Sequence, residues 1–274
     1  MIDDNPDVLA GQISYGDRMP ANYSSPDGYF VAQGYNWQEG KPEPIYKRAG
    51  NSKPHFVATL YRPTSEVRTF LSNFIKSRTP VFLSAQQYNK NMYIGIGHKL
   101  GKLEIANNMI AYRNSGYLPL DDIEVQRVIK KYFKQLQPRL GKTTEQVMRN
   151  LHKPLEVFDK ESTIFVVNFK NSISNDTIQK LFTLDFQRAM NTIQKLVTAP
   201  INENQFVALV SLAFDVEEKR LRQSTLINKI NKGEYDKAVS YFVDFSMIQT
   251  EYRSIVNESQ YKARIKEAEL FSSY

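Results

Sequence analysis

The first residues that could do chemistry lie in and around a glycine-marked stretch, NKNMYIGIGHKL, at residues 89–100. Apolar side chains alternate there with Tyr93, Gly95 and Gly97, a period of two that is typical of a β-strand. Glycines inside a strand mark a bulge or the close approach of a ligand or of other backbone. His98 follows them directly, and a histidine can move a proton in general acid–base catalysis. We expect His98 instead to be structural and to tie this strand to a helical part of the chain.

Acid catalysis would need a carboxyl group near this strand, and the sequence offers few. From Val67 to Leu103 there is no aspartate or glutamate, and only Glu66 and Glu104 flank that window. Residues 61–103 carry seven lysines and arginines against the single Glu66, so seven minus one gives this segment a net charge of +6. Such a composition favours either a solvated basic face or a site for an anion.

The overall composition fits a globular protein with a real core. The chain has 274 residues, 41% of them hydrophobic and 24% charged, with a net charge of +7. It has no cysteine, which excludes disulfides, Cys-based zinc sites and a cysteine nucleophile. We predict no metal, no cofactor and no nucleic-acid partner, since no motif for any of them is present. The sequence has no apolar run of membrane-spanning length and no signal-peptide pattern, so we expect the protein to be made in the cytoplasm.

Residues 1–54 are expected to form an extended N-terminal arm. The first 50 residues hold six of the twelve glycines and five of the twelve prolines, and neither a helical nor a strand period runs through them. Such a segment cannot bury enough of its own surface to offset the entropy of ordering. Its aromatic side chains are the candidate contacts with a partner: Tyr23, Phe30, Tyr35 and Trp37.

The elements that would position the candidate residues begin after the arm. A strand is expected over residues 55–63, and apolar residues at helical spacing predict a helix over residues 65–78, just before the glycine-marked hairpin. A second helix is expected over residues 121–137 and a further strand over residues 162–169. The rest is predicted to be helical, and its boundary signals are Ser174 or Asn175 and Asn202 as N-caps and Gly233 as a break.

Three separated motifs, in this order, resemble the phage-type lysozymes, the muramidase family of tailed-phage endolysins. The first is YIGIGHKL at residues 93–100, and the second is PINENQFVALVSLAFDVEEKRLRQSTLINKINKGEY at residues 200–235. The third is the end of the last helix, EAELF at residues 267–271. The resemblance covers roughly residues 64–110 and 172–271.

The resemblance implies an α+β, lysozyme-like fold with a small β-hairpin lobe, a larger helical lobe and a sugar-binding cleft between them. The lysozyme-like domain would be residues 55–274, with the helical lobe at 173–274. An insertion at about residues 110–172 is longer than such a fold requires, and we expect it to be helical. The candidates for contact with glycan are Tyr93, Gly95, Gly97 and His98.

The resemblance also implies a catalytic glutamate at position 78, an aspartate at position 87 and a water-positioning threonine at position 93. This sequence has Arg78, Gln87 and Tyr93 at those positions. Cleavage of a glycosidic bond needs a proton donor and usually a second carboxylate, whereas arginine keeps its proton. Arg78 could face a ligand or pair with a carboxylate of the helical lobe. The family's Asn-Val-Gly at the end of the core helix has become Asp215, Val216 and Glu217.

These departures lead us to expect a non-catalytic, lysozyme-like structural protein of a bacteriophage virion, in its tail or baseplate. The arm and the insertion would bind other phage structural proteins. Two alternatives stay open, and with them the question of whether the protein is an enzyme. One is an active or weakly active peptidoglycan muramidase with a displaced acid, for which Glu66 and Glu104 are the nearest candidates. The other is a non-catalytic protein that binds peptidoglycan.

Overall fold

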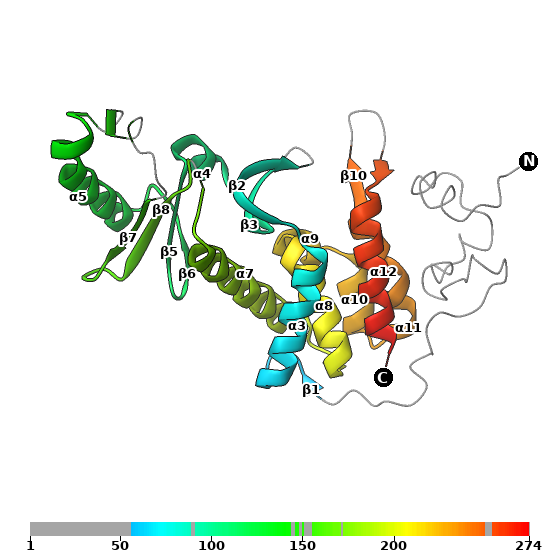
Figure 1. Ribbon diagram of the computed structural model, residues 1–274. Helices are drawn as coiled ribbons and strands as arrows, with labels where there is room; N and C mark the ends of the chain where they lie inside the picture. The colour runs from blue at the N-terminus through cyan, green and yellow to red at the C-terminus, as the bar shows by residue number, and fades with distance from the viewer. Residues whose placement is uncertain are drawn as a thin grey trace, which may run out of the picture. The chain divides into compact units, whose positions relative to one another are not determined.

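The computed structural model describes residues 56–88, 91–143, 146–147, 150, 155–170, 172–249 and 254–273 (Figure 1). The predicted arm and its four aromatic contact candidates lie outside the described residues. The chain divides into two compact units, and each has its own elements and core. The first unit joins the chain up to Arg78 with Ala189–Tyr274, and the second is Thr79–Arg188.

The first unit is mostly helical. Its helices are α3 (Ser65–Arg78), α8 (Glu203–Asp215), α9 (Glu218–Arg222), α10 (Thr225–Asn231), α11 (Tyr235–Ala238), the 3-10 helix η2 (Val239–Ser246) and α12 (Glu258–Ser272). The end of α7, from Ala189 on, also belongs to this unit. Two short antiparallel pairs accompany them: β1 (Phe56–Val57) with β9 (Pro200–Ile201), and β10 (Met247–Gln249) with β11 (Ser254–Val256). The strand expected over residues 55–63 is thus limited to β1, because the chain turns at residues 58–60.

Helix α8 lies at the centre of the first unit. Every residue from Gln205 to Phe214 is buried, so α8 is a core helix rather than an amphipathic one. Asn202 and Gln205 form a reciprocal capping box at its start, which confirms Asn202 as the N-cap. Helices α3 and α12 pack against α8, and Gly233, at φ +74°, separates α10 from α11 as predicted.

The second unit contains two antiparallel sheets. The smaller sheet is β2 (Val81–Tyr88), β3 (Asn91–Ile96) and β4 (His98–Lys99), and it includes the predicted hairpin. After α4 (Lys102–Asn107), four strands form the larger sheet in the order β6-β5-β8-β7. They are β5 (Met109–Arg113), β6 (Gly116–Leu118), β7 (Leu155–Asp159) and β8 (Ile164–Asn168).

The four-stranded sheet corrects our expectation of a helical insertion. Residues 110–172 do contain the predicted helix, α5 (Ile123–Leu140), but they also supply nearly all of the sheet. The sequence analysis did not predict β5, β6 and β7, which are short and, unlike β8, are not continuous runs of β-branched and aromatic residues. The insertion is therefore an α/β element with its own core.

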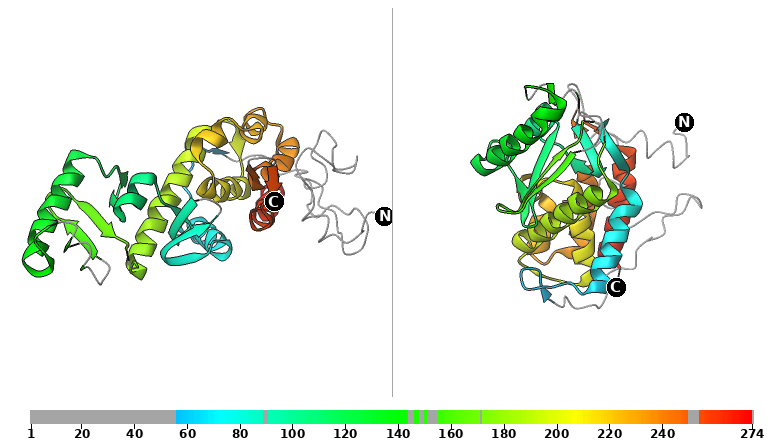
Figure 2. Two further views of the ribbon diagram at one scale, coloured as in Figure 1. Left: turned by 90° about the horizontal axis from the view of Figure 1, so that it is seen from above. Right: turned by 60° about the vertical axis from the view of Figure 1, so that its left-hand side comes forward.

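Helices cover both faces of this sheet (Figures 1 and 2). On one face, Val125, Val128 and Phe133 of α5 join Met109 and Val166 in a buried cluster. On the other lies the first part of α7 (Asn175–Leu196), where Tyr117 donates a hydrogen bond to the Leu181 carbonyl at 3.1 Å. Ser174 accepts a hydrogen bond from the Thr177 amide and so begins α7, as predicted.

Candidate functional site

Arg78 is the last residue of α3, the place where the family resemblance implies a catalytic glutamate. Its guanidinium donates hydrogen bonds to Asp215 Oδ2 at 2.6 Å, to the Ser211 carbonyl oxygen at 2.6 Å and to Ser211 Oγ at 3.1 Å. Glu267 Oε1 lies 3.3 Å from the same group. The Arg78 side chain is 8% exposed, so its guanidinium is held inside the first unit. The sequence left open whether Arg78 faces a ligand or pairs with a carboxylate, and in the structure Arg78 pairs with carboxylates.

A second arginine completes what we call the buried charge cluster, formed by Arg78, Ser211, Asp215, Arg264 and Glu267. Arg264 contacts Asp215 Oδ2 at 2.7 Å and Glu267 Oε2 at 2.8 Å, while Ser211 Oγ donates to Glu267 Oε1 at 2.7 Å. The side chains of Arg264 and Glu267 are both 0% exposed. The cluster joins three elements, α3, α8 and α12, through charge-assisted hydrogen bonds.

Electrostatic interactions determine the protonation states of Arg78 and Asp215. Burial alone would raise the pKa of Asp215, but Arg78 and Arg264 outweigh it and hold that pKa below its ordinary value. Burial likewise opposes the charge on Arg78, and the attraction of Asp215 and Glu267 raises the Arg78 pKa above its ordinary value. Arg78 and Asp215 are therefore both charged across the physiological pH range.

Arg78 and Asp215 are poorly suited to donate a proton in acid catalysis. An arginine whose pKa is raised does not give up its proton, and a carboxylate whose pKa is lowered has no proton to give. Glu267 differs, because burial raises its pKa in spite of the neighbouring arginines. Its side chain is nevertheless fully enclosed, so it cannot contact a substrate. The arrangement is suited to holding α3, α8 and α12 together.

The other two positions where the resemblance implies catalytic side chains lie on the hairpin. Gln87 is exposed on β2 and is paired in register with Met92 of β3. Tyr93 is half-buried on β3, paired in register with Gln86 and Lys99, and its ring meets that of Tyr88 edge-on at 6.3 Å.

The glycines of the hairpin face the chain itself. Gly95 has a φ of +62°, and a Cβ atom placed there would lie 3.9 Å from atoms of Ile173 and of Ile178 in α7. The close approach predicted at this glycine is therefore made by residues of the second unit. Gly97, at φ +69°, turns the chain between β3 and β4 and is half-buried.

His98 is buried and bonded to α7. Its Nδ1 lies 2.9 Å from Asp185 Oδ2, and its ring stacks on Tyr117 with 4.7 Å between the centroids. The Tyr117 hydroxyl donates to the same Asp185 oxygen at 3.1 Å. Burial, followed by the proximity of Asp185, raises the pKa of Tyr117 and keeps this hydroxyl protonated. These contacts give His98 the structural position that the sequence analysis expected.

The two acids that flank the acid-free window are also accounted for. Glu66 lies in the first turn of α3, twelve residues before Arg78, which is about 18 Å along a helix axis. Glu104 accepts a hydrogen bond from the Gly101 amide at 2.6 Å and caps α4. Glu66 is therefore remote from Arg78 along α3, and the Glu104 carboxylate is engaged at the start of α4.

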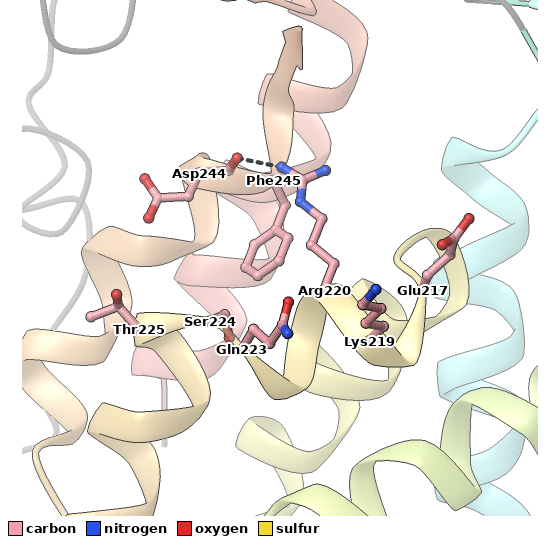
Figure 3. Close-up of a pocket in the computed structure, with 8 residues that line it drawn as sticks. All are labelled: Glu217, Lys219, Arg220, Gln223, Ser224, Thr225, Asp244 and Phe245. Carbon is pink, nitrogen blue, oxygen red and sulfur yellow. Dashed lines mark hydrogen bonds between the residues drawn. The ribbon is translucent and has the colours of Figure 1, made fainter.

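The first unit has a cavity that the sequence analysis did not predict. It measures about 420 Å³ and is lined by residues of α9, the start of α10 and the end of η2 (Figure 3). Arg220 lies over the Phe245 ring at 5.1 Å and donates to the Asp244 carbonyl at 2.8 Å. Lys219 and Glu217 add one charge of each sign, so the lining does not select a ligand by its charge.

Among the described residues, no three or more His, Cys, Asp or Glu side chains lie together in a group that could hold a metal ion, and no helix is both long and apolar enough to cross a membrane.

The sequence analysis found Arg78 and Asp215 but missed Ser211, Arg264 and Glu267 as their partners. A signal was available, because an arginine at the end of an apolar helix must find carboxylates if it is buried. Asp215 at the end of α8 and Glu267 within α12 are such carboxylates on elements that pack together.

Comparison with known proteins supports the resemblance over the helical part of the chain. Residues 161–261 match the phage lysozyme family. The endolysin of Bacillus phage B103 is 34% identical over 74 residues, which is 27% of this chain and 28% of the endolysin. The endolysin of Salmonella phage P22 is 31% identical over 72 residues, which is 26% of this chain and 49% of that protein. The chain thus spans half or less of the length of either relative.

Among solved structures, the muramidase domain of SpmX from Asticaccaulis excentricus aligns with 78% of this chain and 99% of its own, at 16% identity and a TM-score of 0.46. The chain has an α+β fold, and its residues 161–261 are similar to the phage lysozyme family. That segment includes Ser211 and Asp215 but neither Arg78 nor the hairpin.

Proposed function

We propose that this chain is a non-catalytic, lysozyme-like structural protein of a bacteriophage virion. The observation that carries the proposal is the buried charge cluster. Where a muramidase of this family would need a glutamate poised to donate a proton, Arg78 is bound by two carboxylates and a serine. The loss of a general acid costs about 10²–10⁴-fold in rate, and Gln87 and Tyr93 depart from the family at the same time.

A paired change of charge supports the same proposal. The resemblance implies glutamate at position 78 and asparagine at position 215, whereas this chain has Arg78 and Asp215, 2.6 Å apart. A carboxylate at position 215 stabilises an arginine at position 78 but would repel a glutamate there. The two differences therefore suit a structural ion pair and do not suit an acid catalyst.

The assembly role in a tail or baseplate is supported by the parts added to the lysozyme-like body. The insertion brings a four-stranded sheet and α5, and the N-terminal segment brings the aromatic residues Tyr23, Phe30, Tyr35 and Trp37. In the proposed role, both bind other phage structural proteins. Mass spectrometry of gradient-purified particles tests this role. We expect the chain in a fixed ratio to the major tail proteins, and its absence from intact particles would contradict the proposal.

A second candidate function is an active muramidase, which the names of the endolysin relatives favour. It would require a proton donor outside the positions considered above. A third candidate, a non-catalytic peptidoglycan binder, predicts that the chain sediments with insoluble peptidoglycan and is released by soluble fragments.

A further inference from the structure

Strand β7 is one edge of the four-stranded sheet (Figure 1). It pairs with β8 in an unbroken antiparallel register over its five residues. Edge strands are commonly protected against further pairing by a proline, a lysine, a bulge or a very short length. The other edge strand, β6, has three residues and includes Gly116, whereas β7 contains neither proline nor lysine and has no bulge. The sheet therefore has one edge that is open to a further strand.

The hydrogen bonds of β8 show which backbone groups of β7 point outward. The amide of Phe169, directly after β8, donates to the Asn108 carbonyl oxygen at 2.9 Å, so Phe169 bonds toward β5. Successive residues of an antiparallel strand bond alternately to the two neighbouring strands. Phe165 therefore also bonds toward β5, and Phe158, which lies opposite Phe165, turns its N–H and C=O away from β8. The same alternation turns the N–H and C=O of Glu156 outward.

These outward groups form a row to which another strand can bond. Within the described residues, no hydrogen bond reaches the backbone N–H or C=O of Glu156 and Phe158 from outside the sheet. Unpaired backbone groups in such a row are a template for strand addition. A strand added along β7 would satisfy four of these groups at once.

Three side chains on one face of the sheet form what we call the aromatic ladder: Tyr112 of β5, Phe165 of β8 and Phe158 of β7. The Tyr112 and Phe165 rings stack with 5.0 Å between their centroids, and the Phe165 and Phe158 rings with 4.4 Å. Exposure rises along the ladder, from 2% for Tyr112 to 47% for Phe158. The ladder thus ends in an exposed ring at the open edge, and an aromatic side chain directly opposite on an added strand would cover that ring.

We propose that β7 pairs antiparallel with β7 of a second copy of the chain, about a twofold axis at Phe158. The two Phe158 rings then lie opposite each other and join the two aromatic ladders. Each Glu156 lies opposite the partner's Lys160, the exposed residue that follows β7, so opposite charges meet across the pair. One strand supplies both halves of such a twofold interface. The inference goes beyond the proposed function, because it holds whether or not the chain cleaves peptidoglycan or enters a particle.

Sedimentation velocity of the full-length chain across a concentration series measures this self-association. We expect the wild-type chain to reach twice its mass of 31.7 kDa. Glu156→Pro removes an outward N–H and leaves the bonds to β8 intact, a change that edge strands accept. Because the dimer then loses one hydrogen bond from each copy, we expect dimerisation to weaken at least about tenfold.

Glu156→Ala is the matched control. Both variants lose the contacts of the Glu156 carboxylate with Ser174 and Thr177, but only Glu156→Pro loses the N–H. We expect Glu156→Ala to weaken dimerisation severalfold less than Glu156→Pro does. A wild-type chain that stays monomeric at every concentration, or equal effects of the two variants, would overturn the proposal.

Disulfide trapping tests the register without the proline variant. The chain has no cysteine, so each introduced thiol is the only one in its copy. In the proposed register the Cα atoms of position 156 and the partner's position 160 lie about 5.5 Å apart, within the range of a disulfide. We expect Glu156→Cys and Lys160→Cys chains, when mixed, to form disulfide-linked dimers with one chain of each kind.

The control for random collision is Lys134→Cys, since Lys134 is exposed on α5 of the same unit. We expect the mixed dimers at several times the yield that Lys134→Cys gives with either of the other two variants. A yield no higher than this control, or a majority of dimers between two chains of the same kind, would overturn the proposed pairing. Neither result bears on catalysis.

Discussion

At the scale of single residues, Arg78 and Asp215 have to be considered together, because each makes the burial of the other tolerable. Arg78 is 8% exposed, and its partners are the carboxylates of Asp215 and Glu267. A buried ion pair adds little net stability, because desolvation offsets much of the attraction. Removal of one member, by contrast, leaves the cluster with an uncompensated charge, although Arg264 and Glu267 remain as partners.

Replacing Arg78 should therefore destabilise the first unit strongly. We expect Arg78→Met to lower the free energy of unfolding by about 3 kcal/mol, since Asp215 and Glu267 are then left with Arg264 as their one arginine partner. Lys266→Met is the control, because Lys266 is exposed on the same α12 that carries Glu267, and it should change stability by less than about 0.5 kcal/mol. Urea unfolding measures both. Similar effects from the two substitutions would contradict the cluster's role.

The same pair predicts how stability depends on pH. The Asp215 pKa is lowered in the folded chain, so this group contributes stability above its unfolded pKa of about 3.9. That contribution is lost as the pH falls below about 4 and through the folded pKa. Asp215→Asn should therefore flatten the acid side of a plot of melting temperature against pH between 3 and 7. An unchanged acid slope would show that Asp215 is not held by the arginines.

At the scale of elements, the sequence predicted helix ends that depend on neighbouring residues. It did not predict strands whose partners lie far away in the sequence. The sequence predicted α3 to the residue and predicted the caps Asn202 and Ser174, because caps depend on three or four neighbouring side chains. Strand β7 was missed, since its partner β8 is a separate short run and the pairing, not the segment itself, makes it a strand. The sequence predicted the hairpin but not which residues approach Gly95. Those residues begin 78 positions later in the chain, at Ile173, so no local pattern identifies them.

Gly95 provides a test at this scale. Its φ of +62° is strained for any other residue, while the space around it would accept a Cβ atom at 3.9 Å. We expect Gly95→Ala to cost about 1–2 kcal/mol, the usual penalty of the left-handed conformation, and not the larger penalty of a steric clash. Lys130→Ala is the control in the same unit, since Lys130 is exposed on α5 and alanine is a good helix former. Thermal unfolding followed by circular dichroism should show a clear decrease only for Gly95→Ala.

At the scale of the whole molecule, the departures at the implied catalytic positions lie outside the segment that matches the family, whereas Asp215 and Glu217 lie inside it. The match covers residues 161–261, whereas Arg78, Gln87 and Tyr93 precede it. A sequence shows that residue types have changed, but it does not show whether a displaced group has taken over their chemistry. The structure bears on the two nearest candidates for a displaced acid. Glu66 lies in the first turn of α3, at the opposite end from Arg78, and the Glu104 carboxylate caps α4.

The measurement that most directly tests the loss of catalysis is turbidity clearing of outer-membrane-permeabilised bacteria by the purified chain. The comparison is a variant with Arg78→Glu, Gln87→Asp and Tyr93→Thr, and with Asp215→Asn so that the new glutamate does not face the carboxylate of Asp215. The same variant without Arg78→Glu is the control. We predict no clearing by the wild-type chain, and clearing by the full variant alone would add that its glycan site is intact. Clearing by the wild-type chain would contradict the account and make the chain an active muramidase.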